Sequence, residues 1–190
     1  MGRTRIIGVA AVLTTAAMSG IGGAASAKPL DHGDFHDEFS ELVPNFCESA
    51  GLTVQIDGVI DGKFLVNARG RDDLVYFKEH LRISVTYTNV SNDTFVTSRE
   101  RSVNKDLKVI DNGDGTLTIV VLATGNAAVF GADGKAIGRN PGQVRFELLV
   151  DHAGTPSDPS DDVVIQDLGI IKGSTGRSDD FCAAVVPALT

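Results

Sequence analysis

The densest group of side chains that could do chemistry lies between positions 151 and 162. Four aspartates share this short segment with two prolines: Asp151, Asp158, Asp161, Asp162, Pro156 and Pro159. Carboxylate and carbonyl oxygens are the ligands that Ca2+ takes in proteins, so the segment is a candidate calcium loop. Its spacing matches no familiar calcium-binding pattern, and the competing interpretation is a solvated acidic turn stiffened by its prolines. We therefore predict no metal in this loop.

Two other groups of polar residues have a superficially metal-like spacing. The run from Asp111 to Gly115 resembles an EF-hand loop, but glycines stand at its third and fifth places, where that loop needs oxygen ligands. This run therefore predicts a hairpin turn. His32 and His36, with Asp34 and Asp37, would share one face of a helix and could hold a metal there. Because they lie close to the start of the mature chain, we expect solvent-exposed side chains and no metal or cofactor.

Residues suited to catalysis are sparse. The Gly-x-Ser-x-Gly signature of the common α/β serine hydrolases is absent. His80 and His152 are the only histidines in the region expected to fold. His152 follows Asp151 at the expected end of a strand and could act as a general base, but a surface histidine at a loop mouth is the simpler interpretation. We assign no catalytic residue.

Charged residues alternate along two of the expected strands. Arg145 and Glu147 project to the same side of their strand, and Arg99 and Arg101 do the same, with Glu100 opposite. If that side faced a barrel interior, Arg145, Glu147 and nearby polar groups would line a pocket suited to an isomerase or cyclase that positions a reactive small molecule. If it faces water, these are ordinary exterior cross-strand pairs, which is the better interpretation.

The first 27 residues have the pattern of an export signal. Arg3 and Arg5 precede an apolar run from Ile6 to Met18, and Ala25-Ser26-Ala27 follows. The apolar run is too short to span a bilayer by itself, and small residues at its end are typical of a cleavage site. The sequence predicts cleavage between Ala27 and Lys28 and a secreted, extracellular mature protein that does not stay in the membrane.

Cys47 and Cys182 are the only cysteines in the chain. An even count in an exported protein favours a disulfide. The bridge would join the start of the folded region to its end, and closing so long a loop is worth about 5 kcal/mol in the chain-entropy model. The alternative is a nucleophilic thiol, which would need a base and a free partner.

Composition limits the partners. The formal net charge is -8, and the leader carries two of the positive charges and none of the negative ones. Nucleic acid and anionic membranes bind through clustered Lys and Arg, and no such cluster is visible along the sequence. The chain has no Trp and two Tyr, so stacking platforms for sugars or bases are few. We expect a monomer without a nucleic-acid or membrane partner.

The chain beyond Leu52 is a series of β-type runs separated by turn residues, without a sustained helical period. Turns are predicted at Asp61-Gly62, at Asp111 to Gly115 and at Asn140-Pro141-Gly142. Counted this way, there are about nine or ten strands. Short connections favour an antiparallel meander, and we expect it to close as an up-and-down β-barrel, with a two-sheet β-sandwich as the alternative.

The expected organisation is a signal peptide over 1–27, an N-terminal tail and short edge element over 28–45, and a single β-domain over 46–190. Positions 28–34 are expected to be a mobile tail, and 35–42 a short helical turn or an edge strand. Positions 173–179 are expected to be a flexible loop that returns Cys182 to Cys47. A chain of this length can bury one ordinary core without metal.

Three segments resemble those of an uncharacterised group of exported bacterial all-β proteins with a disulfide that joins the two ends of the domain. They run from Asp111 to Thr118, from Asn140 to Val144 and from Ser178 to Cys182. The resemblance implies one extracytoplasmic β-domain and supplies no activity or ligand. Together these observations predict a secreted, disulfide-stapled barrel that binds a small apolar ligand or a protein partner without catalysis. A small-molecule isomerase or cyclase is the alternative.

Overall fold

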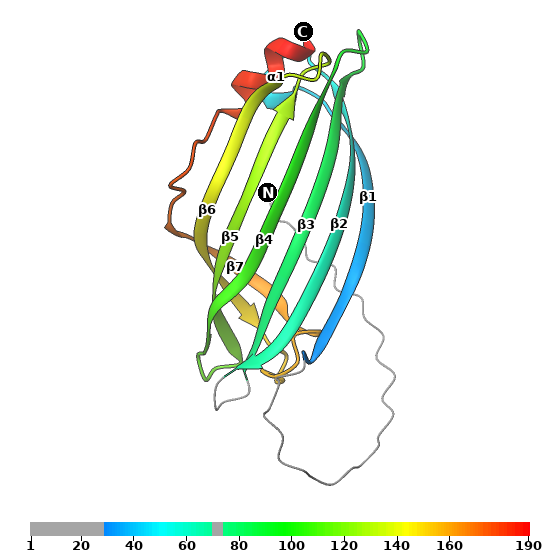
Figure 1. Cartoon of the computed structure of the whole chain (residues 1–190). Helices are drawn as coiled ribbons and strands as arrows, with labels where there is room; N and C mark the ends of the chain where they lie inside the picture. The colour runs from blue at the N-terminus through cyan, green and yellow to red at the C-terminus, as the bar shows by residue number, and fades with distance from the viewer. Residues whose placement is uncertain (1–28, 70–73) are drawn as a thin grey trace.

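The computed structural model describes residues 29–69 and 74–190, so the predicted leader and its cleavage site between Ala27 and Lys28 lie outside the described residues. The described chain forms seven long strands, a short 3-10 helix and an α-helix (Figure 1). The strands are β1 (Asp31–Val43), β2 (Val54–Arg69), β3 (Leu74–Asn89), β4 (Phe95–Asp111), β5 (Thr116–Phe130), β6 (Ala136–Asp151) and β7 (Val163–Lys172). The helices are η1 (Phe46–Glu48) and α1 (Phe181–Leu189). The all-β prediction is confirmed.

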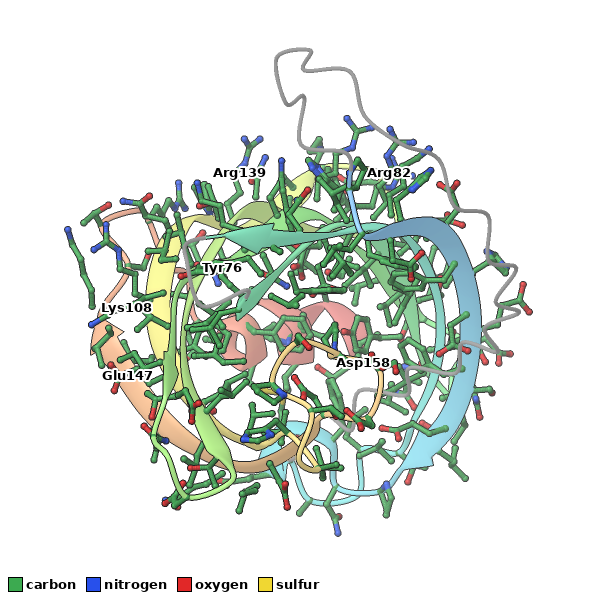
Figure 2. All side chains as sticks on the ribbon, turned by 90° about the horizontal axis from the view of Figure 1, so that it is seen from below. Tyr76, Arg82, Lys108, Arg139, Glu147 and Asp158 are labelled. Carbon is green, nitrogen blue, oxygen red and sulfur yellow. A yellow bond between two sulfur atoms is a disulfide. The ribbon has the colours of Figure 1, made fainter. Side chains whose placement is uncertain are left out.

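All seven strands form one antiparallel sheet, in the order in which they occur in the chain. This confirms the predicted meander, and the strands form one sheet where the alternative required two. The sheet curls around an interior when it is viewed end-on (Figure 2). Among the described residues β1 is hydrogen-bonded only to β2, and β7 only to β6, so each keeps one unpaired edge.

The expected number of about nine or ten strands was wrong because two predicted turns lie inside strands. Asp61-Gly62 belongs to β2, and Asn140-Pro141-Gly142 belongs to β6. A Cβ at Gly62 would overlap the ring of Phe35, and a Cβ at Gly142 would overlap the Ser174 hydroxyl. Glycine at these two positions therefore reflects a close approach of another group and not a turn.

The turn predicted between Asp111 and Gly115 is confirmed as the β4–β5 hairpin. Gly113 and Gly115 have φ angles of 75° and 89°, in the left-handed region that glycine adopts without strain. The Asp111 carboxylate accepts the Gly113 N–H at 2.8 Å, and the Asp114 carboxylate accepts the Thr116 N–H at 3.0 Å. The carboxylates thus stabilise the turn itself.

The N-terminal edge strand is longer than expected. β1 begins at Asp31, within the segment predicted to be a tail, and it pairs with β2 along its whole length. Of the two alternatives for positions 35–42, the edge strand is the one observed. Phe35 and Phe39 lie on one side of this strand, and their rings cover Gly62 and Gly58 of β2.

One end of the curled sheet is filled by an apolar cluster around α1, which lies at the top of Figure 1. Val185 and Leu189 of α1 are completely buried, and they pack with Val54, Val96 and Val129 from three strands. The Asn89 side chain donates a hydrogen bond of 3.0 Å to the Leu189 carbonyl. No helix among the described residues is long and apolar enough to cross a membrane.

The predicted disulfide between Cys47 and Cys182 is present and ties η1 to α1. The segment that leads to Cys182 runs beside β6, where the Asp179 N–H donates to the Arg139 carbonyl at 3.1 Å. α1 itself was not predicted. A signal for it exists in Asp180, whose side chain accepts the Ala183 N–H at 2.9 Å and caps an Ala- and Val-rich segment.

The other end of the sheet contains a second apolar cluster, which we call the lower apolar cluster. It is made by Val109, Leu117, Ile119, Val121, Leu148 and Val150, with Leu74, Tyr76 and Phe146 packed against it. The loop between β6 and β7 lies across this end of the sheet, with Asp158 inside the ring of strands (Figure 2). The interior is therefore filled by apolar side chains at both ends.

Candidate functional site

Strand register separates an inner face of the sheet from an outer face. Phe39, Gly58, Val85, Ser98, Val129 and Gly138 are consecutive partners across six strands. Because Val85 and Val129 belong to the cluster around α1, this whole row lies on the inner face. Figure 2 agrees, since Arg82, Lys108, Arg139 and Glu147, which the register places on the outer face, lie outside the ring of strands.

Between the two apolar clusters the inner face carries a mixture of small, polar and apolar side chains, which we call the inner band. One of its rows is Phe35, Gly62, Leu81, Ser102, Gly125 and Gly142, and the next is Asp37, Ile60, Ile83, Glu100, Ala127 and Asn140. Leu81, Glu100 and Ala127 are only half-buried, whereas the residues of the two clusters are buried. The inner band is thus a part of the interior that solvent still reaches.

Two aromatic rings are exposed beside the inner band. Phe35 is 38% exposed and Phe39 is 39% exposed, although both rings lie against the inner face of β2. They fit there because Gly62 and Gly58 have no side chain, and a Cβ at either position would overlap the ring. An aromatic ring that stays exposed next to a half-buried surface offers apolar area to a ligand.

Charge is distributed unequally between the two faces. Asp37, Glu79, Glu100 and Asp106 lie on the inner face, and none of the described basic side chains of β1 to β6 does. Glu79 accepts a hydrogen bond of 2.8 Å from the Asn104 amide. Glu100 forms no hydrogen bond or ion pair with any residue that the structure describes. The predicted position of Glu100, opposite Arg99 and Arg101, is confirmed.

Arg145 and Glu147 lie on the outer face of β6, so the charged interior pocket lined by these two residues was wrong. The expected exterior cross-strand pairs are not formed, because neither residue faces an opposite charge, and Nε of Arg145 is buried without a hydrogen-bond partner among the described residues. Their partners on β5 are Leu122 and Val120, whereas Phe146 and Leu148 point to the lower apolar cluster. The apolar residues of β6 occupy the interior, and strand alternation then forces the charged residues outward.

The surface interpretation of His152 was wrong, because this residue is only 7% exposed. Its Nδ1 atom has no hydrogen-bond partner among the described residues, and neither does Oδ1 of Asp162. Burial first, and then the negative charges of Asp161, Asp158 and Asp106, raise the pKa of Asp162 to about 6, while His152 opposes the shift. His152, Asp162 and the buried Asp106 form the lower polar cluster. Asp106 was not singled out by the sequence; it precedes a β-bulge in β4.

The loop proposed as a calcium site uses its carboxylates locally. Asp158 accepts the Ser160 N–H at 3.0 Å, and Asp161 accepts the Thr155 hydroxyl at 2.6 Å. Asp151 accepts the Ala153 N–H at 2.9 Å. Over residues 29–69 and 74–190, no three His, Cys, Asp or Glu side chains are grouped as metal ligands.

His32 and His36 lie in a strand, so the helical arrangement that could have paired them does not occur. The ring of His36 is 2.8 Å from the Asp61 carboxylate and 3.2 Å from the Glu38 carboxylate. These two hydrogen bonds, that to Asp61 first, raise the pKa of His36. All three groups are exposed, so the interaction is a solvated surface pair.

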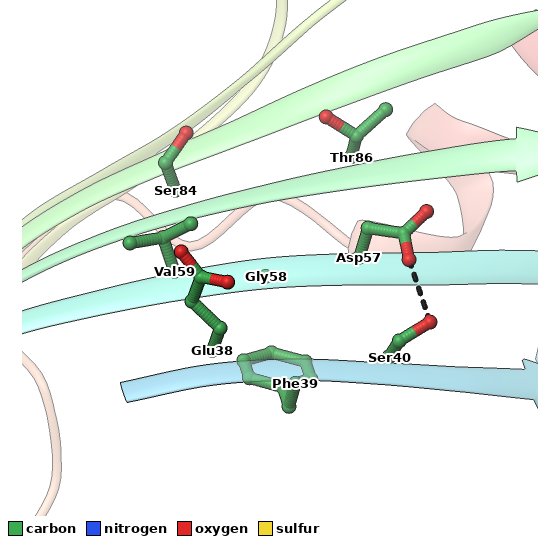
Figure 3. A pocket seen from close by; sticks show the side chains of 8 residues that line it. All are labelled: Glu38, Phe39, Ser40, Asp57, Gly58, Val59, Ser84 and Thr86. Carbon is green, nitrogen blue, oxygen red and sulfur yellow. Dashed lines mark hydrogen bonds between the residues drawn. The ribbon is translucent and has the colours of Figure 1, made fainter. Parts of the chain in front are cut away.

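Two shallow depressions lie along the outer face. Figure 3 shows the first, where the Ser40 hydroxyl donates to Asp57 at 2.7 Å. The Gln55 amide donates to Ser40 at 2.8 Å, so these polar groups already have partners within the protein. The second depression is lined by Arg82, Arg99 and Arg101, and also by Asp61, Asn126 and Phe130.

No protein-family model, curated protein or solved structure matches this chain.

Proposed function

We propose that this protein binds a small, largely apolar molecule on the inner band and that it does so without catalysing a reaction. The observation that carries the proposal is the exposure of Phe35 and Phe39 on the inner face, 38% and 39%, between two clusters whose side chains are buried. Binding sites for small molecules combine apolar walls with a few polar groups, and the inner band offers both.

The charge of the inner face defines the ligand further. Asp37 and Glu100 lie in one row of the band, and Phe35 and Phe39 flank Asp37 on the same side of β1. A carboxylate ligand would be repelled by these acids, whereas a protonated amine would be attracted by them and by the faces of the two rings. The proposed ligand is therefore neutral or cationic.

The same proposal includes secretion and closure of the sheet as an up-and-down barrel. Closure is supported by apolar residues that stay exposed on β7, next to its unpaired edge. Ile170 is 68% exposed and Val164 is 41% exposed, and both are register partners of inner-face residues of β6. An approach of β1 to β7 would cover these side chains. The disulfide is consistent with an oxidising, extracellular-type environment.

Isothermal titration calorimetry of the mature protein with three ligands of equal chain length tests the proposal. We expect decanol and decylammonium to bind with one site per chain, and decanoate to bind at least tenfold more weakly. Absence of binding by all three would refute the proposed function, and tighter binding of decanoate would refute the assigned charge preference.

A pair of adjacent alanines provides the matched control. Ala127 lies on the inner band, and Ala128 lies on the outer face. We expect Ala127→Leu to weaken decanol binding at least tenfold and Ala128→Leu to leave it unchanged. The reverse result would place the ligand in the outer depression.

The lower polar cluster favours a second candidate function, a small-molecule isomerase or cyclase. Asp162, with a pKa of about 6, can exchange a proton near neutral pH, and His152 is buried beside it. If this candidate is right, the bound ligand should take up deuterium from D2O, and the Asp162→Asn variant should abolish that uptake. If the bound ligand takes up no deuterium, binding without catalysis remains as the proposed function.

A further inference from the structure

A basic surface that is invisible along the sequence is assembled by the pairing of β3 with β4. Lys78 and Arg82 of β3 and Arg99, Arg101 and Lys105 of β4 all lie on the outer face. We call these five residues the basic stripe. Lys78 lies directly opposite Lys105, and Arg82 lies directly opposite Arg101.

One acid lies beside the basic stripe: Asp61 of β2 is the direct register partner of Arg82, but its carboxylate contacts His36 at 2.8 Å and forms no ion pair with Arg82. The outer faces of β3, β4 and β5 carry no Asp or Glu side chain, and none of the five cations forms an ion pair with a described residue. Outer-face acids such as Glu38 and Asp61 lie on β1 and β2. In a chain with a net charge of -8, this is a concentrated positive region.

The arrangement is unfavourable for folding. Like charges that face each other directly across an antiparallel pair destabilise a sheet. A partner that neutralises these two pairs would relieve their repulsion. Three of the cations, Arg82, Arg99 and Arg101, line the second outer depression. The Arg99 guanidinium lies 5.5 Å from the centre of the Phe130 ring, which restricts its orientation.

We propose that the basic stripe binds a linear anionic polysaccharide through its sulfate or phosphate groups. Planar guanidinium groups bind such anions through two parallel hydrogen bonds. From Arg99 to Lys105 the stripe extends for about 20 Å at the rise of a β-strand, which spans several anionic groups of a polymer. This partner is independent of the ligand proposed for the inner face.

Two other anionic partners fit less well. Nucleic acid bound in single-stranded form needs aromatic platforms for its bases, and the one ring at the depression, Phe130, is already covered by Arg99. A flat bilayer cannot enter a depression, so the arginines that line it would not reach lipid headgroups together.

Fluorescence anisotropy with a labelled heparin octasaccharide tests the proposal on the mature protein. We expect binding at low salt, with log K falling against log salt with a slope of about -3, as for four neutralised anionic groups on a single-stranded polyanion. Unlabelled single-stranded DNA or vesicles of anionic phospholipid serve as competitors. Stronger competition by either one than by unlabelled heparin would overturn the proposal, as would absence of heparin binding.

Matched variants separate the stripe from overall charge. The double variant Arg82→Gln with Arg101→Gln should weaken heparin binding at least tenfold. It should also make the slope of log K against log salt shallower by about 1.4. The control, Lys135→Gln with Lys172→Gln, makes the same change in net charge outside the stripe and should bind like the wild type. The double variant Arg82→Lys with Arg101→Lys should keep the salt slope but bind more weakly, because lysine lacks the planar fork. Equal losses of heparin affinity in the Arg82→Gln, Arg101→Gln variant and in the lysine control would contradict the proposal.

Discussion

Arg82 and Arg101 lie directly opposite each other on the outer face of β3 and β4, and neither forms an ion pair with a described residue. We expect Arg101→Gln to raise the free energy of unfolding by about 0.2–1 kcal/mol, because it removes a like-charge contact and its other register partner, Asn126, is neutral. Thermal unfolding in low salt measures the gain, which should vanish in 1 M salt, where charges are screened within about 3 Å. Lys135→Gln, which breaks the Lys135–Asp133 pair, is the control and should bring no gain. A destabilised Arg101→Gln variant would contradict this account.

Gly58 and Phe39 form a second coupled pair. A Cβ at position 58 would overlap the Phe39 ring, so we expect Gly58→Ala to destabilise the protein by about 1–3 kcal/mol through overpacking. Phe39→Leu should remove most of that cost when it is combined with Gly58→Ala. Chemical unfolding of the two single variants and the double variant gives the coupling energy, and strictly additive effects would show that the ring does not lie over Gly58.

Asp162 should make stability depend on pH. Its pKa rises from 3.8 to about 6 on folding, so its favourable contribution is complete below pH 3.8 and is lost as the pH rises through 6. Asp162→Asn removes the ionised form, and after solvent screening we expect it to stabilise the protein by about 1–2 kcal/mol at pH 7.5. At pH 5, between the two pKa values, the gain should be about half as large. Melting temperatures of both proteins at the two pH values measure the difference, and an equal gain at both would exclude a raised pKa.

The disulfide should contribute strongly to stability, because it closes a loop between residues 135 positions apart. We expect the double variant Cys47→Ser with Cys182→Ser to lose about 2–5 kcal/mol in guanidinium unfolding. α1 is also held by the buried Leu189 and by Asn89, so the variant should still fold. A loss below about 1 kcal/mol would mean that these contacts alone fix α1.

Local patterns in the sequence predicted the parts of the fold that depend on neighbouring residues. Alternation from Val144 to Val150 correctly separated inner from outer positions in β6, and the glycines after Asp111 correctly marked a hairpin. The long strands were divided wrongly because Gly62 and Gly142 have the composition of turns. Glycine is required at these two positions because Phe35 and Ser174, which are remote in sequence, lie against them.

The candidate sites could not be predicted because they depend on register between strands. The basic stripe requires that Arg82 face Arg101, and no local pattern specifies that pairing. His152 was placed at the surface because its loop is polar, but that loop folds back across the end of the sheet (Figure 2). A polar loop can bury a residue when it covers an apolar cluster.

Tryptophan fluorescence tests the central claim, ligand binding at the inner band, most directly. The chain contains no Trp, so one introduced residue is the only reporter. Leu81→Trp places it on the inner band and Val103→Trp on the outer face, and both positions are half-buried. With 10-bromodecan-1-ol, a ligand whose bromine quenches nearby tryptophan, we expect saturable quenching in the Leu81→Trp variant and none in the Val103→Trp variant. Quenching that is equal in the two variants, or confined to Val103→Trp, would contradict the account.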